Sequence, residues 1–191
     1  MPEISRTAQV LRYFAQQYQA VSNKGIPRLR LVKMAYMSDV LAREYLESPV
    51  TSFNYYRYHL GPYDDAIIDA IEELVNAGLA ETRTEWSETG DTKRLVGRGA
   101  PIAFQFTAGE LEVMKYVADT YMTMEMREFI EDVVYLTVPM VEAKDRDPRD
   151  KVPLNMDQLN NVGTERVGFR LEDVLRAEEA IRAGRYVTTL I

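Results

Sequence analysis

The sequence of 191 residues contains no cysteine and a single histidine, His59. The absence of cysteine excludes disulfide scaffolds, thiolate zinc sites and cysteine nucleophiles. One histidine cannot form a multi-histidine metal site. The sequence also lacks a phosphate-binding P-loop and a G-x-S-x-G nucleophile elbow. We therefore expect no catalytic residue, no metal site and no cofactor.

Long apolar runs are missing as well. The longest uncharged, apolar-rich run covers residues 133–141 and contains Pro139, whereas a helix needs roughly 20 apolar residues to cross a bilayer. Residues 1–17 mix charged with apolar side chains, unlike the apolar core of a secretory signal. The sequence thus predicts a soluble, cytoplasmic protein that does not bind membranes.

Positive charge is scarce, because 23 Lys and Arg stand against 30 Asp and Glu, which gives a net charge of −7 at pH 7. Nucleic acids are bound through many cationic contacts to phosphate, so this balance disfavours them as partners. Hydrophobic residues make up 46% of the chain, as in ordinary globular proteins. The length suits one domain with a substantial core.

Apolar residues recur at helical spacing in six segments. The predicted helices cover residues 7–21, 27–46, 107–121, 125–137 and 171–183, with one more between Gly61-Pro62 and Gly78. The last of these has the apolar stripe Ile67, Ile68, Ile71, Leu74 and Val75. Thr107 and Glu110 have the spacing of a capping box, and Pro139 should end the helix before it.

Two segments have the composition of strands. Residues 50–60 are rich in β-branched and aromatic side chains, and residues 80–106 contain two strand-like runs around a polar turn. The predicted fold is mainly α with a small β element. Residues 1–143 should form a winged-helix-like helical domain with a β-hairpin, 144–168 a polar linker loop, and 169–191 a C-terminal helix packed on the same domain.

Acidic residues dominate the helix that follows Gly61-Pro62. It holds no Lys or Arg between Tyr63 and Leu79. In a winged helix this element usually enters the DNA major groove, where its carboxylates would here face phosphates. The acids either recognise a protein partner or form a solvated face that complements the helix dipole. Both interpretations stay open from the sequence.

Aromatic residues crowd the segment before that helix, where Tyr56, Tyr58 and Tyr63 flank Arg57 and His59. Exposed Tyr and Arg are frequent hot spots of protein interfaces. Alternatively, alternate tyrosines of this strand point into the core. The cations around residues 24–43 could likewise meet an acidic protein or RNA, or pair with acids of the fold itself.

The order of three motifs resembles the SocA-like antitoxin or Panacea domain family, also described as phage-associated proteins. Residues 31–39, LVKMAYMSD, are similar to its L-x-K-L-x-Y-x-A-D helix, with Ser38 in place of the usual alanine. Residues 58–63, YHLGPY, match its aromatic-x-x-Gly-Pro corner, and residues 135–139, YLTVP, are similar to its late threonine and proline segment. The resemblance covers roughly residues 8–155. Met140 and Val141 stand where the family often has an aromatic residue.

The resemblance implies a helical domain that neutralises a toxin without catalysis, either by sequestering it or by presenting it to a protease. The toxin could be encoded by an adjacent gene, and the protein could be a homodimer. The candidate partner-binding residues are Lys33, Asp39, Tyr56, Arg57, Tyr58, His59, Tyr63, Asp64 and Asp65.

Two other functions remain open. A winged-helix transcriptional regulator would bind nucleic acid through Arg28, Arg30, Lys33, Lys93, Arg94 and Arg98. An enzyme ranks third, since no spacing of carboxylates, tyrosines and histidine singles out a site.

Overall fold

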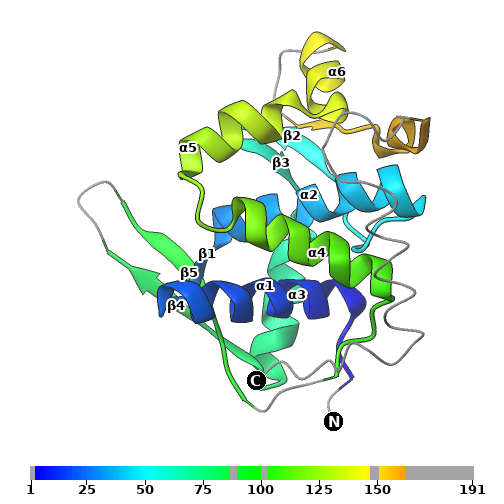
Figure 1. Ribbon diagram of the computed structural model, residues 1–191. Coiled ribbons are helices and arrows are strands. Elements are labelled where there is room, and N and C mark those ends of the chain that lie inside the picture. Colours follow the sequence, from blue (N-terminus) through cyan, green and yellow to red (C-terminus); the bar gives the residue numbers. More distant parts are fainter. Residues whose placement is uncertain (1–2, 87–89, 100–102, 147–150, 162–191) are drawn as a thin grey trace.

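The computed structural model describes residues 3–86, 90–99, 103–146 and 151–161 (Figure 1). The helix predicted over 171–183 lies outside them. The described α-helices are α1 (Arg6–Ser22), α2 (Arg28–Leu46), α3 (Ala66–Asn76), α4 (Ala108–Tyr121), α5 (Met126–Glu128) and α6 (Val138–Arg146). A π-helix (Phe129–Val133) and two 3-10 helices (Val134–Leu136 and Met156–Asn161) complete the helical part. The strands are β1 (Ile26–Pro27), β2 (Tyr56–Tyr58), β3 (Gly61–Tyr63), β4 (Ala80–Glu85), β5 (Thr92–Gly97) and β6 (Val152–Pro153). The prediction of a mainly α protein with a small β element is confirmed.

Helix α2 lies at the centre of the protein. Every residue from Arg30 to Ala42 is buried, charged residues included, because other elements cover this part of the helix. Helices α1 and α4 and the last 3-10 helix pack around it (Figure 1). No helix in the described ranges is both long enough and apolar enough to cross a membrane.

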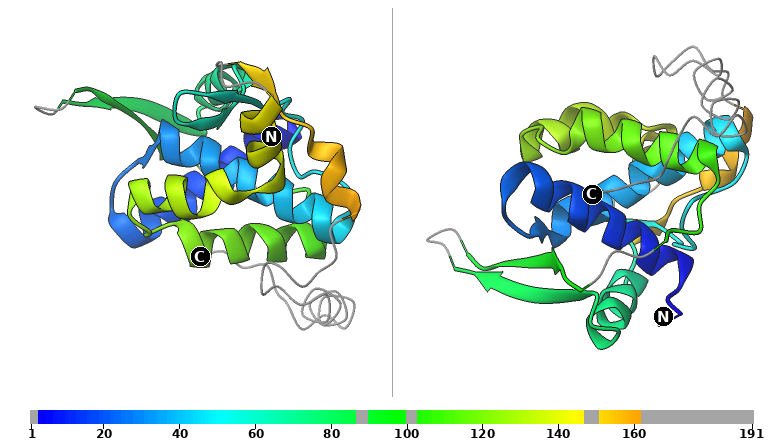
Figure 2. Two further views of the ribbon diagram at one scale, coloured as in Figure 1. Left: turned by 90° about the horizontal axis from the view of Figure 1, so that it is seen from above. Right: turned by 60° about the horizontal axis from the view of Figure 1, so that its bottom comes forward.

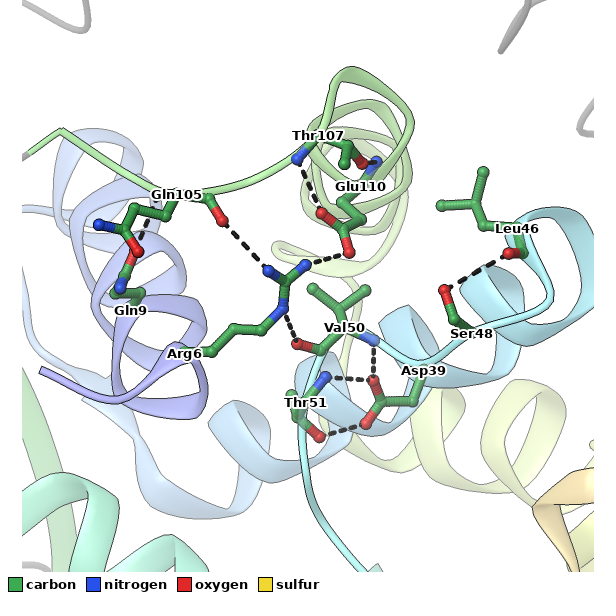
Figure 3. Close-up of polar contacts among 10 residues, drawn as sticks. All are labelled: Arg6, Gln9, Asp39, Leu46, Ser48, Val50, Thr51, Gln105, Thr107 and Glu110. Carbon is green, nitrogen blue, oxygen red and sulfur yellow. Dashed lines mark hydrogen bonds and ion pairs between the residues drawn. The ribbon is translucent and has the colours of Figure 1, made fainter.

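The start of α1 is fixed by contacts to distant segments (Figure 3). Arg6 donates from Nε to the Val50 carbonyl at 3.2 Å and from Nη1 to the Gln105 carbonyl at 3.2 Å, and it forms an ion pair with Glu110. Glu110 is also part of the predicted capping box, in which Thr107 accepts from the Glu110 N–H at 3.3 Å. The start of α1, the segment at Val50 and the N-terminal end of α4 are therefore connected through Arg6.

The described strands form two three-stranded sheets, ordered β1-β5-β4 and β3-β2-β6. Strands β4 and β5 pair from Ala80↔Gly97 to Glu85↔Thr92, and this predicted hairpin projects from the helical body (Figures 1 and 2). Strands β2 and β3 pair from Tyr56↔Tyr63 to Tyr58↔Gly61. The strand predicted over residues 50–60 is limited to Tyr56–Tyr58, because Val50 and Thr51 donate their backbone N–H groups to Asp39 instead of to a neighbouring strand.

The structure differs from the sequence-based expectation after residue 137. Pro139 lies in the first turn of α6, where a missing N–H costs nothing. The segment expected as a polar linker, 144–168, contains the end of α6, the strand β6 and a 3-10 helix packed on α2. Burial of Val152 and Leu159 explains the order of this segment, since apolar burial offsets the entropy lost by the chain.

Candidate partner-binding surface

Several polar residues of α2 are buried. Lys33 is 1% exposed, and its Nζ donates to the Pro62 carbonyl at 2.7 Å. The Tyr36 hydroxyl is hydrogen-bonded to Thr137 Oγ1 at 2.7 Å. Helix α2 therefore holds both the Gly-Pro turn and the segment before α6. Because burial disfavours the charged form, it lowers the pKa of Lys33 to about 7.

Asp39 is another buried charge of α2, at 1% exposure, and Figure 3 shows its contacts with Val50 and Thr51. Its carboxylate accepts from the backbone N–H groups of Val50 and Thr51 at 2.7 and 2.8 Å. It also accepts from the Thr51 hydroxyl and from the Tyr55 hydroxyl, the latter at 2.9 Å. Burial raises the pKa of Asp39, and these donated bonds oppose the rise. The network fixes the chain just before β2.

Beyond these internal contacts, four side chains gather at the surface of the β2–β3 hairpin. We call Tyr56, Tyr58, His59 and Tyr63 the tyrosine corner. The ring of Tyr58 lies 6.0 Å from that of Tyr56, 6.1 Å from that of Tyr63 and 4.2 Å from that of His59, between centroids. The three tyrosines are half-buried and His59 is exposed. The corner therefore presents a compact aromatic surface.

Gly61 makes the turn of this hairpin possible. Its φ of +97° lies where side chains are strained, and an added Cβ would approach Tyr135, Lys33 and Val134 at 3.3–3.4 Å. The Tyr135 hydroxyl also donates to the His59 carbonyl at 3.3 Å. The turn is thus held tightly against the segment that precedes α6.

A cation covers one side of the tyrosine corner. Lys151 Nζ lies 5.7 Å from the ring centroids of both Tyr56 and Tyr58, within the range of a cation–π contact. Strand β6 places it there, because the Lys151 N–H donates to the Arg57 carbonyl at 2.6 Å. No sequence pattern indicated this residue, which lies in a charged segment far from the hairpin along the chain.

Carboxylates border the corner at the start of α3. The Tyr56 hydroxyl donates to Asp65 at 3.0 Å. Burial, and this bond to a carboxylate, raise the pKa of Tyr56. Asp64 accepts from the backbone N–H groups of Ala66 and Asn54 at 2.9 and 2.5 Å. Asp65 therefore adds a carboxylate beside the aromatic surface, while Asp64 fixes the backbone of the neighbouring residues.

The structure brings together most of the residues predicted to bind a partner. Those on or beside the β2–β3 hairpin are Tyr56, Arg57, Tyr58, His59, Tyr63, Asp64 and Asp65. Lys33 and Asp39, predicted for the same surface, are buried. They position the hairpin through hydrogen bonds with Pro62 and Tyr55. Leu60 is 52% exposed at the tip of the hairpin. It was missed although it directly follows His59 in the turn.

The residues predicted for nucleic-acid binding do not all lie on one surface. Arg30 is buried and donates to the carbonyls of Tyr121 and Met124 at 2.8 and 2.7 Å. Arg94 forms an ion pair with Glu85, and Arg98 forms one with Glu81 at 2.7 Å. Lys33 is internal. Arg28 and Lys93 remain beside the hairpin β4–β5, where both line grooves.

Helix α3 also differs from expectation on one face. Ile67, Ile71 and Leu74 are buried as predicted, whereas Ile68 and Val75 are 40% and 38% exposed. Their assignment to the buried stripe is wrong. The core-facing stripe is narrower than predicted, and these two residues, seven apart on one helical face, line a groove beside the β4–β5 hairpin instead.

The described ranges contain no cluster of three or more His, Asp or Glu side chains placed to hold a metal ion.

Comparison with protein-family models matches residues 31–134 to the family described as "Antitoxin SocA-like, Panacea domain". This range covers more than half of the chain and includes the first two motifs, which confirms the resemblance predicted from the sequence. Searches of curated proteins and of solved structures found no match.

Proposed function

Because the chain belongs to the SocA-like antitoxin family with a Panacea domain, we propose that it binds and neutralises a toxin protein through the tyrosine corner. The grouping of the three tyrosines with His59 on one exposed hairpin supports this site most directly. Tyrosine supplies large contact area at low cost in side-chain entropy. The proposed mechanism is sequestration, without a chemical step on the toxin.

The internal network of α2 supports the same proposal. The charged residues of the first family motif hold the β2–β3 hairpin at two points. Lys33 binds the Pro62 carbonyl in β3, and Asp39 binds the Tyr55 hydroxyl just before β2. A rigid support lowers the entropy that a surface loses when it binds. We infer that these residues serve binding indirectly, by positioning the aromatic side chains.

The winged-helix assignment belongs to this proposal too. The order is α1-β1-α2-β2-β3-α3-β4-β5, with β1 paired to β5. Apart from the β2–β3 hairpin between α2 and α3, this is the order of helices and strands in a winged helix. Helix α3 would then occupy the place of the DNA-reading helix. Asp69 and Glu72 are exposed on it, which disfavours contact with phosphates. This supports a winged helix adapted to bind a protein.

A co-expression experiment tests the proposed function. The adjacent gene is induced with and without this protein, and growth is measured together with co-purification on a tag attached to this chain. We expect growth inhibition that this protein relieves, and a complex that co-purifies. Growth inhibition that this protein relieves without forming a complex would contradict sequestration. An adjacent gene whose product does not inhibit growth would contradict the assignment of that product as the toxin.

Substitution of the tyrosine corner should weaken the complex. Tyr58→Ala removes the ring that contacts the other three side chains of the corner. We expect the Kd for the co-purified partner to rise about tenfold to a hundredfold, corresponding to a hot spot of about 1.4–3 kcal/mol. Calorimetric titration measures this change.

The matched control is Tyr116→Ala, which removes a half-buried tyrosine from α4, outside the β2–β3 hairpin. Its Kd should stay within about twofold of the unsubstituted protein. Equal effects of both substitutions would show that loss of stability, not loss of a contact, weakens the complex. An unchanged Kd for Tyr58→Ala would place the interface elsewhere.

A further inference from the structure

Two grooves meet along the β4–β5 hairpin. One, of about 530 Å³, lies between the hairpin and α3, and the other, of about 630 Å³, lies between the hairpin and the tyrosine corner. Arg28, Thr84 and Lys93 line both. We call the two together the hairpin groove. The tyrosine corner therefore forms one end of a longer concave surface.

Although the net charge of the chain is −7, more Lys and Arg than Asp and Glu line the hairpin groove. The lining residues of each kind are Arg28, Lys33, Arg83, Lys93 and Arg94 against Glu72 and Asp91. Arg83 and Arg94, which line it, are paired with Glu81 and Glu85. In contrast, Arg28 and Lys93 make no ion pair with a carboxylate of the described ranges. Cations in a concave site that have no ion pair among the described residues attract negative charge from a binding partner.

Large apolar side chains accompany these cations. Trp86 is 78% exposed near the end of the hairpin, and Ile68 and Val75 are each about two-fifths exposed on α3. Several exposed apolar residues along one concave surface are typical of an interaction site. The complementary ligand must therefore combine negative charge with apolar side chains.

We propose that the hairpin groove binds an acidic segment of a partner protein that carries leucine or aromatic residues among its carboxylates. Nucleic acid also combines negative charge with stacking surfaces. However, Glu72 and Asp91 lie among the groove residues, and they would repel a regular phosphate backbone. A peptide can place its carboxylates beside Arg28 and Lys93 and its apolar residues elsewhere. The proposal rests on the proposed function, because it describes the chemistry of the bound partner.

Trp86 provides the measurement, because it is the only tryptophan of the chain and lines the groove. The full chain is titrated with a short synthetic peptide that contains glutamate, with leucine or phenylalanine at every third or fourth position. We expect the Trp86 emission to shift to shorter wavelength as the peptide covers it. A peptide with glutamine in place of glutamate should bind about tenfold more weakly, and one with lysine should not bind.

A charge-reversed variant tests whether the peptide binds in the groove. Arg28→Glu with Lys93→Glu should weaken acidic-peptide binding about tenfold or more. The control, Lys24→Glu with Lys144→Glu, makes the same change in net charge at exposed positions outside the groove. Its affinity should fall by about twofold at most, through long-range charge alone. Equal urea midpoints of the two variants show that both remain folded.

Three results would overturn the proposal. They are equal binding of the glutamate and glutamine peptides, equal loss in the two charge-reversed variants, and tighter binding of an oligothymidylate than of the acidic peptide. The titrations contain no toxin, so they fail independently of the co-expression experiment. Relief of toxicity together with an inert groove would retain the proposed function and reject this inference.

Discussion

The Asp39→Ala variant is expected to lose about 3–5 kcal/mol of its free energy of unfolding, because it leaves buried donors without an acceptor. Four hydrogen bonds end on this carboxylate, from the N–H groups of Val50 and Thr51 and from the hydroxyls of Thr51 and Tyr55. Water cannot replace the lost acceptor easily, since Asp39 is 1% exposed. Urea denaturation followed by circular dichroism measures the loss.

The control for this prediction is Asp132→Ala, which removes an exposed carboxylate from the π-helix. It should change the free energy of unfolding by about 0.5 kcal/mol or less. Asp39→Asn should fall between the two, because an amide retains one oxygen acceptor but adds an N–H₂ donor. A loss for Asp39→Ala no greater than that of the control would show that the network does not stabilise the fold.

Periodicity predicted the helical body because most helices here have one apolar and one polar face. It also predicted the capping box at Thr107, whose two reciprocal hydrogen bonds depend only on residues three apart. The short 3-10 helix at Met156–Asn161 was missed. Its burial depends on contacts with α2, which lie far away in the sequence. Local patterns do not contain that information.

The candidate site was predicted only where it depends on residues close together in the sequence. The tyrosines and Asp65 follow one another closely in sequence, so a single hairpin brings them together. Lys33 and Asp39 were predicted to belong to the same partner-binding surface. However, α1, α4 and the last 3-10 helix pack around α2, so residues 30–42 have no solvated face to receive a charge. Local patterns do not show this packing, which leaves both residues buried in hydrogen-bonded roles.

The buried ammonium of Lys33 should make the stability of the protein depend on pH. Burial lowers its pKa from 10.5 to about 7, so between these values the unfolded chain binds a proton that the folded protein does not. The free energy of unfolding therefore rises with pH in this range. From about pH 6 to about pH 9 the expected contribution of Lys33 is about 2–3 kcal/mol. Urea denaturation at several pH values measures it.

The Lys33→Met variant isolates this contribution, because methionine fills a similar space without a titrating group. Glu44 has the opposite effect, since burial raises its pKa to about 7 and stability falls as pH rises through that value. Both proteins contain Glu44, so its effect cancels in the difference between them. As pH rises, the free energy of unfolding of the unsubstituted protein should increase relative to that of Lys33→Met. A difference that is constant with pH would mean that Lys33 keeps its proton on folding, with the Pro62 carbonyl compensating for its burial.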